Sequence, residues 1–95
     1  KGILVAVLDT GVDVDHVDLK GAVVESKDFT GSRSGSADVQ GHGTHCAGII
    51  GARQNDTGIV GAAPECRLLN LKCLGDSGSG SDIGIAAAID YAVEK

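Results

Sequence analysis

The sequence predicts an α/β fold with a mostly parallel sheet. Residues 3–8 (Ile-Leu-Val-Ala-Val-Leu) are continuously apolar, which is typical of a strand that is buried on both faces. Loop, helix, strand and helix patterns follow one another along the rest of the chain, and this order favours helices layered on a sheet. In such a fold, ligands bind beyond the carboxyl ends of the strands.

A second, weaker strand is predicted at residues 22–28, and the Gly/Ser-rich stretch at 31–41 reads as a surface loop. Residues 41–51 are too rich in glycine to be helical by propensity alone, because each interior Gly costs up to about 1 kcal/mol relative to Ala. A helix here therefore requires tertiary packing. Its glycines predict that it presses closely against the sheet.

The last two elements are a Leu-rich strand at 67–74 and a helix from residue 81 onward. Ser81 and Asp82 suit the N-terminal end of that helix. Spacing by four residues predicts one apolar face, made of Ile85, Ile89 and Val93.

Composition excludes several classes of function. A chain of 95 residues fits one small domain or part of a larger one. It has two aromatic residues and a net charge of -5, so nucleic acid is a poor partner. No apolar run approaches the roughly 18 to 20 residues that cross a bilayer. We expect a monomer that does not enter a membrane.

The three cysteines do not form a disulfide framework. None has the CxxC spacing of a zinc or redox site. Cys66 and Cys73 flank the predicted strand, whose rise of about 3.3 Å per residue would hold them roughly 23 Å apart, against a limit of about 7 Å for a bridge. We expect buried thiols that pack as small apolar side chains.

Asp9 is the first candidate for chemistry. A carboxylate directly after a buried strand is costly unless it has a partner. The simpler interpretation is a turn residue in Asp9-Thr10-Gly11. His42 could be the partner, since it opens a helix that must start at the same edge of the sheet. A carboxylate on Nδ1–H would leave Nε2 free to accept a proton, as in a general base.

Metal binding is a weaker interpretation of His42-Gly43-Thr44-His45, in which the two imidazoles are three residues apart on a helix. No HExxH pattern is present. His45 is predicted to be a packed, hydrogen-bonded histidine. His16, in an Asp-rich turn, is predicted to be structural.

Two segments together resemble a known family. Val7-Leu-Asp-Thr-Gly-Val-Asp13 is similar to the catalytic-Asp motif of the subtilisin-like serine proteases, and Gly41-His-Gly-Thr-His-Cys-Ala-Gly48 is similar to their catalytic-His motif. The segments 16–19, 61–64 and 71–75 also match the family. The resemblance implies a three-layer sandwich around a mostly parallel sheet. It also implies a serine endopeptidase in which Asp9 and His42 belong to an Asp/His/Ser triad.

The chain departs from the family pattern in two ways. Val17 replaces a usual Pro, and no Gly-Thr-Ser-x-Ala nucleophile motif occurs. Residues 1–95 are therefore expected to be a partial catalytic domain, truncated at both ends and inactive alone. The alternative is a non-catalytic relative that keeps the fold as a protein-binding module.

The resemblance also implies binding residues. An extended protein or peptide substrate would lie against four residues: Leu74, Gly78, Ser79 and Gly80. A flexible strand-to-helix loop is the simpler interpretation. The chemistry needs no cofactor, but a structural calcium site is implied at five residues: Asp18, Arg53, Asn55, Thr57 and Ile59. Turn hydrogen bonds alone would also explain Asp18 and Asn55. By resemblance, we expect a secreted protein.

Overall fold

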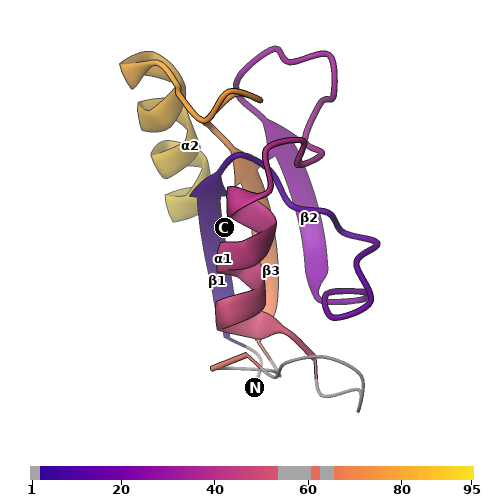
Figure 1. The fold of residues 1–95 in the computed structure, drawn as a ribbon. Coiled ribbons are helices and arrows are strands. Elements are labelled where there is room, and N and C mark those ends of the chain that lie inside the picture. The colour runs from indigo at the N-terminus through magenta and orange to yellow at the C-terminus, as the bar shows by residue number, and fades with distance from the viewer. Residues whose placement is uncertain (1–2, 54–60, 63–65) are drawn as a thin grey trace.

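A computed structural model describes residues 3–53, 61–62 and 66–95, which form a parallel sheet with one helix on each face (Figure 1). The strands are β1 (Leu4–Asp9), β2 (Val23–Asp28) and β3 (Arg67–Lys72), in the order β1-β3-β2. Helix α1 spans His42–Gly51 and helix α2 spans Asp82–Glu94. The predicted α/β class and the layered, parallel arrangement are confirmed.

The two faces of the sheet carry separate apolar cores. Val5 and Val7 of β1 pack with Leu68 of β3 and Ala47 of α1. The alternate strand residues point the other way, against α2; they include Leu4, Ala6, Leu8, Leu69 and Leu71. Both faces of β1 are thus covered, which is the reason for its unbroken apolar sequence.

The cysteines follow the same division between the faces. Cys66 belongs to the core under α1 and Cys73 to the core under α2. All three cysteines are free thiols. The prediction that Cys66 and Cys73 do not pair is confirmed, because the sheet separates them.

Glycines let α1 approach the sheet, as predicted. A Cβ atom on Gly51 would lie 3.1 Å from Sγ of Cys66 and 3.3 Å from Cδ1 of Leu68. A Cβ atom on Gly43 would overlap the carbonyl oxygen of Gly11. The first turn of α1 therefore lies backbone to backbone against the chain that leaves β1.

Helix α2 uses a different face from the one predicted. Ser81 is its N-cap and accepts a hydrogen bond from Gly84 N–H at 3.0 Å, as expected. The buried residues, however, are Gly84 and Ala88, whereas Ile89 and Val93 are exposed. Spacing by four drifts about 40° per step around a helix of 3.6 residues per turn. Only Ile85 of the predicted stripe packs on the sheet, alongside Tyr91 and Ala92.

Two buried polar side chains of β3 hold the loop that follows β2. The Lys72 side chain is fully buried, and its Nζ donates to the Ser34 hydroxyl at 2.8 Å and to the Ala37 carbonyl at 2.7 Å. Asn70 Nδ2 donates to the Ser36 carbonyl at 2.9 Å. Since a buried ammonium requires such partners, β3 fixes the course of residues 34–37.

The third partner of Lys72 is the carboxylate of Asp76, at 2.7 Å. The Lys72 ammonium and the hydroxyls of Ser32 and Ser34 lower the pKa of Asp76 from 3.8 to about 2. One cation therefore joins the loop after β2 to the loop after β3.

Replacing Gly43 by Ala should destabilise the fold by roughly 2 kcal/mol or more, because the added methyl group meets backbone that cannot rotate away. Gly48→Ala is the matched control, since a Cβ there has nothing within 4 Å and helix propensity favours Ala by up to about 1 kcal/mol. Urea denaturation measures both. Equal stability of the two variants would contradict the close contact.

Asp76 should titrate near pH 2 in the folded protein. Because its folded pKa lies below the unfolded value of 3.8, its stabilising contribution is complete above that value and is lost as the pH falls through about 2. The measurement is the ¹³C shift of its carboxyl carbon against pH. In Lys72→Met the midpoint should rise toward 3.8, and an unchanged midpoint would exclude Lys72 as the cause.

Candidate active site

The end of β1 and the start of α1 bring Asp9 and His42 together. Asp9 is the last residue of β1, and His42 is the first residue of α1. Nδ1 of His42 lies 2.9 Å from Oδ1 and 2.8 Å from Oδ2 of Asp9. This is a hydrogen-bond distance. The contact that the sequence predicts across 33 positions is confirmed.

Asp9 is a buried carboxylate with its partners in place. Its side chain is 12% exposed, whereas that of His42 is 62% exposed. The Thr10 N–H donates to Oδ1 of Asp9 at 2.7 Å. The backbone carbonyl of Asp9 accepts from the N–H groups of Cys73 and Leu74, both at 3.0 Å. Asp9 is thus fixed by the residues that follow β3 as well as by its own turn. The turn bond that the simpler interpretation predicts coexists with the contact to His42.

The geometry defines what the pair can do with a proton. A carboxylate accepts hydrogen bonds, so the tautomer that satisfies it carries the proton on Nδ1 of His42. Nε2 is then an acceptor on an exposed ring. The pair can take a proton at Nε2 while Asp9 holds the ring orientation.

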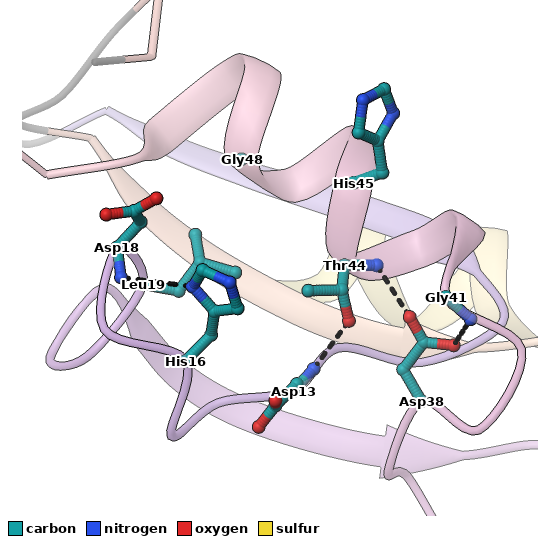
Figure 2. Close-up of a pocket in the computed structure, with 9 residues that line it drawn as sticks. All are labelled: Asp13, His16, Asp18, Leu19, Asp38, Gly41, Thr44, His45 and Gly48. Atoms are coloured by element: carbon teal, nitrogen blue, oxygen red, sulfur yellow. Dashed lines mark hydrogen bonds between the residues drawn. The ribbon is translucent and has the colours of Figure 1, made fainter. Parts of the chain in front are cut away.

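Asp38 links the end of β1 to the start of α1, and the sequence analysis did not identify it as a site residue. Its Oδ1 accepts from Gly41 N–H at 2.7 Å and its Oδ2 from Thr44 N–H at 2.8 Å (Figure 2). Oδ1 also accepts from the Thr10 hydroxyl at 2.8 Å. Burial acts to raise the pKa of Asp38, but the hydrogen bonds from Thr44, Gly41 and Thr10 outweigh it and lower the pKa below 3.8. An acidic residue just before a helix is the signal that could have identified it.

Cys46 lies beside the His42 ring, one helical turn along α1. Its Sγ is 3.7 Å from Nδ1 and 3.9 Å from Nε2 of His42. Burial raises the pKa of the Cys46 thiol, and the negative charge of Asp9 and a hydrogen bond to that carboxylate raise it further. Cys46 is therefore a neutral thiol at physiological pH and a weak nucleophile.

Asp9, His42 and Cys46 are also a candidate metal-binding group, with donor atoms within 4.8 Å of one another. Nδ1 of His42 lies 2.9 Å and 2.8 Å from the two oxygens of Asp9, which is a direct hydrogen-bond distance and leaves no room for an ion between these donor atoms. A proton-transfer pair with a neighbouring thiol accounts for the group better than a metal site.

A cavity of about 380 Å³ lies between α1 and the loop at 13–19 (Figure 2). His16 and His45 both line it. His16 Nδ1 accepts from Asp18 N–H at 3.1 Å, a turn bond of the kind that the predicted structural role requires. His45 is exposed, so the prediction of a packed histidine is wrong; the helix turns its side chain outward.

Comparison with known proteins identifies the family. The model of the Subtilase family (Peptidase_S8) matches residues 1–95. The chain belongs to the subtilase family. It is 48% identical over 100 residues to the major intracellular serine protease of Bacillus subtilis (strain 168), covering 100% of this chain and 31% of that protein.

Other subtilases are similarly close. The intracellular serine protease of Paenibacillus polymyxa is 46% identical over 99 residues, with 100% of this chain and 30% of the relative covered. The solved structure of Sphericase has a TM-score of 0.90 and 46% identity, over 99% of this chain and 32% of that one. The chain thus spans about a third of the length of these relatives, and the subtilisin-like fold is shown.

The residues that the subtilase resemblance assigns to substrate lie in the loop after β3. This loop closes on itself, since Gly75 N–H donates to the Ser79 carbonyl at 2.7 Å. Gly78 has a φ of +93°, and a Cβ on Gly80 would overlap the Cys73 carbonyl oxygen. The backbone geometry of the loop therefore explains why Gly78 and Gly80 are glycines. The contact of Gly78, Gly80 and Leu74 with substrate stays a prediction.

The implied calcium site is only partly described. Arg53 N–H donates to the Asp18 carbonyl at 2.6 Å, so the backbones of two predicted ligand residues are adjacent and their oxygen donors suit calcium. The other three, Asn55, Thr57 and Ile59, lie outside the described residues. Calcium binding stays a prediction. Among residues 3–53, 61–62 and 66–95, no helix is long and apolar enough to span a membrane.

Cys46 should be the only one of the three cysteines that a maleimide modifies in the folded protein, because Cys66 and Cys73 are buried. The reaction should be slower than that of a free thiol, since the raised pKa of Cys46 leaves little thiolate. Mass spectrometry of peptides measures the rate at each site.

A bulky mercurial on Cys46 should push the first turn of α1 away from Asp9. Cys46→Ala is the control, and in this variant the reagent should leave the position of the first turn of α1 unchanged. Equal modification of Cys66 under native conditions would contradict the described packing.

Proposed function

We propose that this chain supplies the orienting carboxylate, Asp9, and the general base, His42, of a serine endopeptidase. The contact of 2.8 Å between Nδ1 of His42 and Oδ2 of Asp9 carries the proposal. Membership of the subtilase family and relatives that are named serine proteases support it.

The proposed reaction is acyl transfer to a serine that a segment outside these 95 residues supplies. As the serine Oγ bonds to the substrate carbonyl carbon, its proton passes to Nε2 of His42. Asp9 stabilises the imidazolium and keeps the ring in place. His42 then protonates the amine as the C–N bond breaks, and water repeats the sequence to release the acid.

The proposed substrate is a protein or peptide in an extended conformation, bound beside the loop of Leu74, Gly78, Ser79 and Gly80. The loop leaves β3 at the same sheet edge as Asp9, because Asp9 pairs with Lys72 in the parallel register. It has no bulky side chain between Gly75 and Gly80. A second backbone could therefore approach it.

Calcium at the loops of Asp18 and Arg53 would stabilise the fold and take no part in the chemistry. The family resemblance implies secretion, whereas two relatives are named intracellular proteases. Free thiols suit a reducing compartment as well. The compartment does not affect the proposed reaction.

Hydrolysis of a chromogenic peptide by a protein that contains this chain within a complete subtilase domain tests the proposal. Asp9→Asn should lower kcat roughly 10⁴-fold and His42→Ala roughly 10⁶-fold, which are the magnitudes that loss of the triad Asp and His costs in serine proteases. Asp28→Asn, a change of the same kind at the end of β2, should leave kcat unchanged, because its carboxylate bonds to Thr30 and Gly31.

The 95-residue chain alone should have no activity, because no serine in it follows a Gly-Thr pair. Full activity of His42→Ala would exclude the proposed role. Binding of peptides without hydrolysis by the complete protein would instead favour the non-catalytic binding module.

A further inference from the structure

The first turn of α1 depends on side chains from outside the helix. Its N-cap, Gly41, has no side chain to cap with, and the first turn has no acidic residue. The N–H groups of the first helical residues, which are His42, Gly43 and Thr44 in α1, have no acceptor within the helix. Here they bond to the side chains of Gln40, Thr10 and Asp38, at 2.8 Å, 2.9 Å and 2.8 Å respectively.

We propose that Asp38 is a positioning residue for the Asp9–His42 pair, fixing the first turn of α1 relative to the end of β1. Its effect on catalysis rests on the function proposed above, whereas its effect on the geometry of the pair does not.

The two carboxylate oxygens of Asp38 have different hydrogen-bond partners. Oδ2 binds the N–H of Thr44, which lies two residues after His42 in α1. Oδ1 binds the N–H of Gly41, directly before His42, and the hydroxyl of Thr10, directly after Asp9. One carboxylate therefore contacts the immediate neighbours of both members of the pair.

The Thr10 hydroxyl completes the link. It donates to Asp38 and accepts from the N–H of Gly43 at 2.9 Å, while the backbone N–H of Thr10 donates to Asp9. Thr10 is 1% exposed, so water does not replace these bonds readily. Asp38 and Thr10 act as one unit between strand and helix.

Asp38 can act in this way because its own backbone is held. It directly follows Ser36 and Ala37, whose carbonyls accept from the buried side chains of Asn70 and Lys72. The same two carbonyls lie 2.7 Å and 2.6 Å from where a Cβ on Gly11 would be. The loop, the turn after β1 and the start of α1 are thus packed together.

Asp38→Asn keeps the size of the side chain but replaces one accepting oxygen by an NH₂ group. That group would face an N–H of α1 or Gly41, and two donors cannot bond to each other. We expect the first turn of α1 to shift, and the distance between His42 and Asp9 to increase. A misplacement of about 1 Å can cost roughly 10²-fold in rate.

The test is a double-mutant cycle on Asp38→Asn and Thr10→Val, in the complete protein that the function assay uses. Each single variant should lower kcat roughly 10- to 100-fold and leave KM within about 2-fold, since neither residue contacts substrate in the proposal. The double variant should be no worse than the poorer single one, because both break the same link. Thr10→Ser, which keeps the hydroxyl, should recover most of the loss in Thr10→Val.

A second readout does not need activity. The proton on Nδ1 of His42, followed by NMR, should exchange faster with solvent in Asp38→Asn and in Thr10→Val than in the unchanged protein. Asp28→Asn is the matched control, because its carboxylate also accepts three hydrogen bonds but from Thr30 and Gly31, which directly follow β2.

The outcomes separate the two proposals. The positioning role would be overturned if the losses of kcat in the two single variants were additive. It would also be overturned if the Nδ1 proton of a folded Asp38→Asn protein exchanged at an unchanged rate. If neither the unchanged protein nor any variant hydrolyses peptide, the proposed function is wrong. In that case the exchange rate of the Nδ1 proton still decides the role of Asp38.

Discussion

The approach of α1 to the end of β1 rests on one backbone contact. Gly43 lies against the carbonyl of Gly11 with no room for a side chain between them. This contact brings the N–H of Gly43 within reach of the Thr10 hydroxyl, and places His42 over the carboxylate of Asp9. Asp9 and His42, which are 33 positions apart, can therefore meet because residue 43 has no Cβ.

Sequence reasoning located this pair because its signals are local. An apolar run ending in Asp and a glycine-rich segment opening with His each stand out within ten residues. Parallel topology then places both at one edge of the sheet. The proximity of Asp9 and His42 can thus be predicted from the sequence.

Sequence reasoning did not find what holds the pair in place. Asn70 and Lys72 lie in a strand that looks apolar, and their partners are 34 to 38 residues away, in a loop that looks unstructured. Asp38 shares this property, since its bond to Thr10 spans 28 residues. No periodicity encodes such long-range polar contacts. The error in α2 has another origin: burial there follows small residues at the sheet, Gly84 and Ala88, and not the largest apolar ones.

The burial of Lys72 also bears on the response of the protein to ionic strength. Salt screens charges that face solvent, as in the pair of Lys95 and Glu25, which are 3.4 Å apart and 38% and 37% exposed. The ammonium of Lys72 has no exposed surface, and two of its three partners are uncharged oxygens. Counterions cannot approach it. The loop that carries Asp38 should therefore keep its place in concentrated salt, where surface ion pairs no longer contribute.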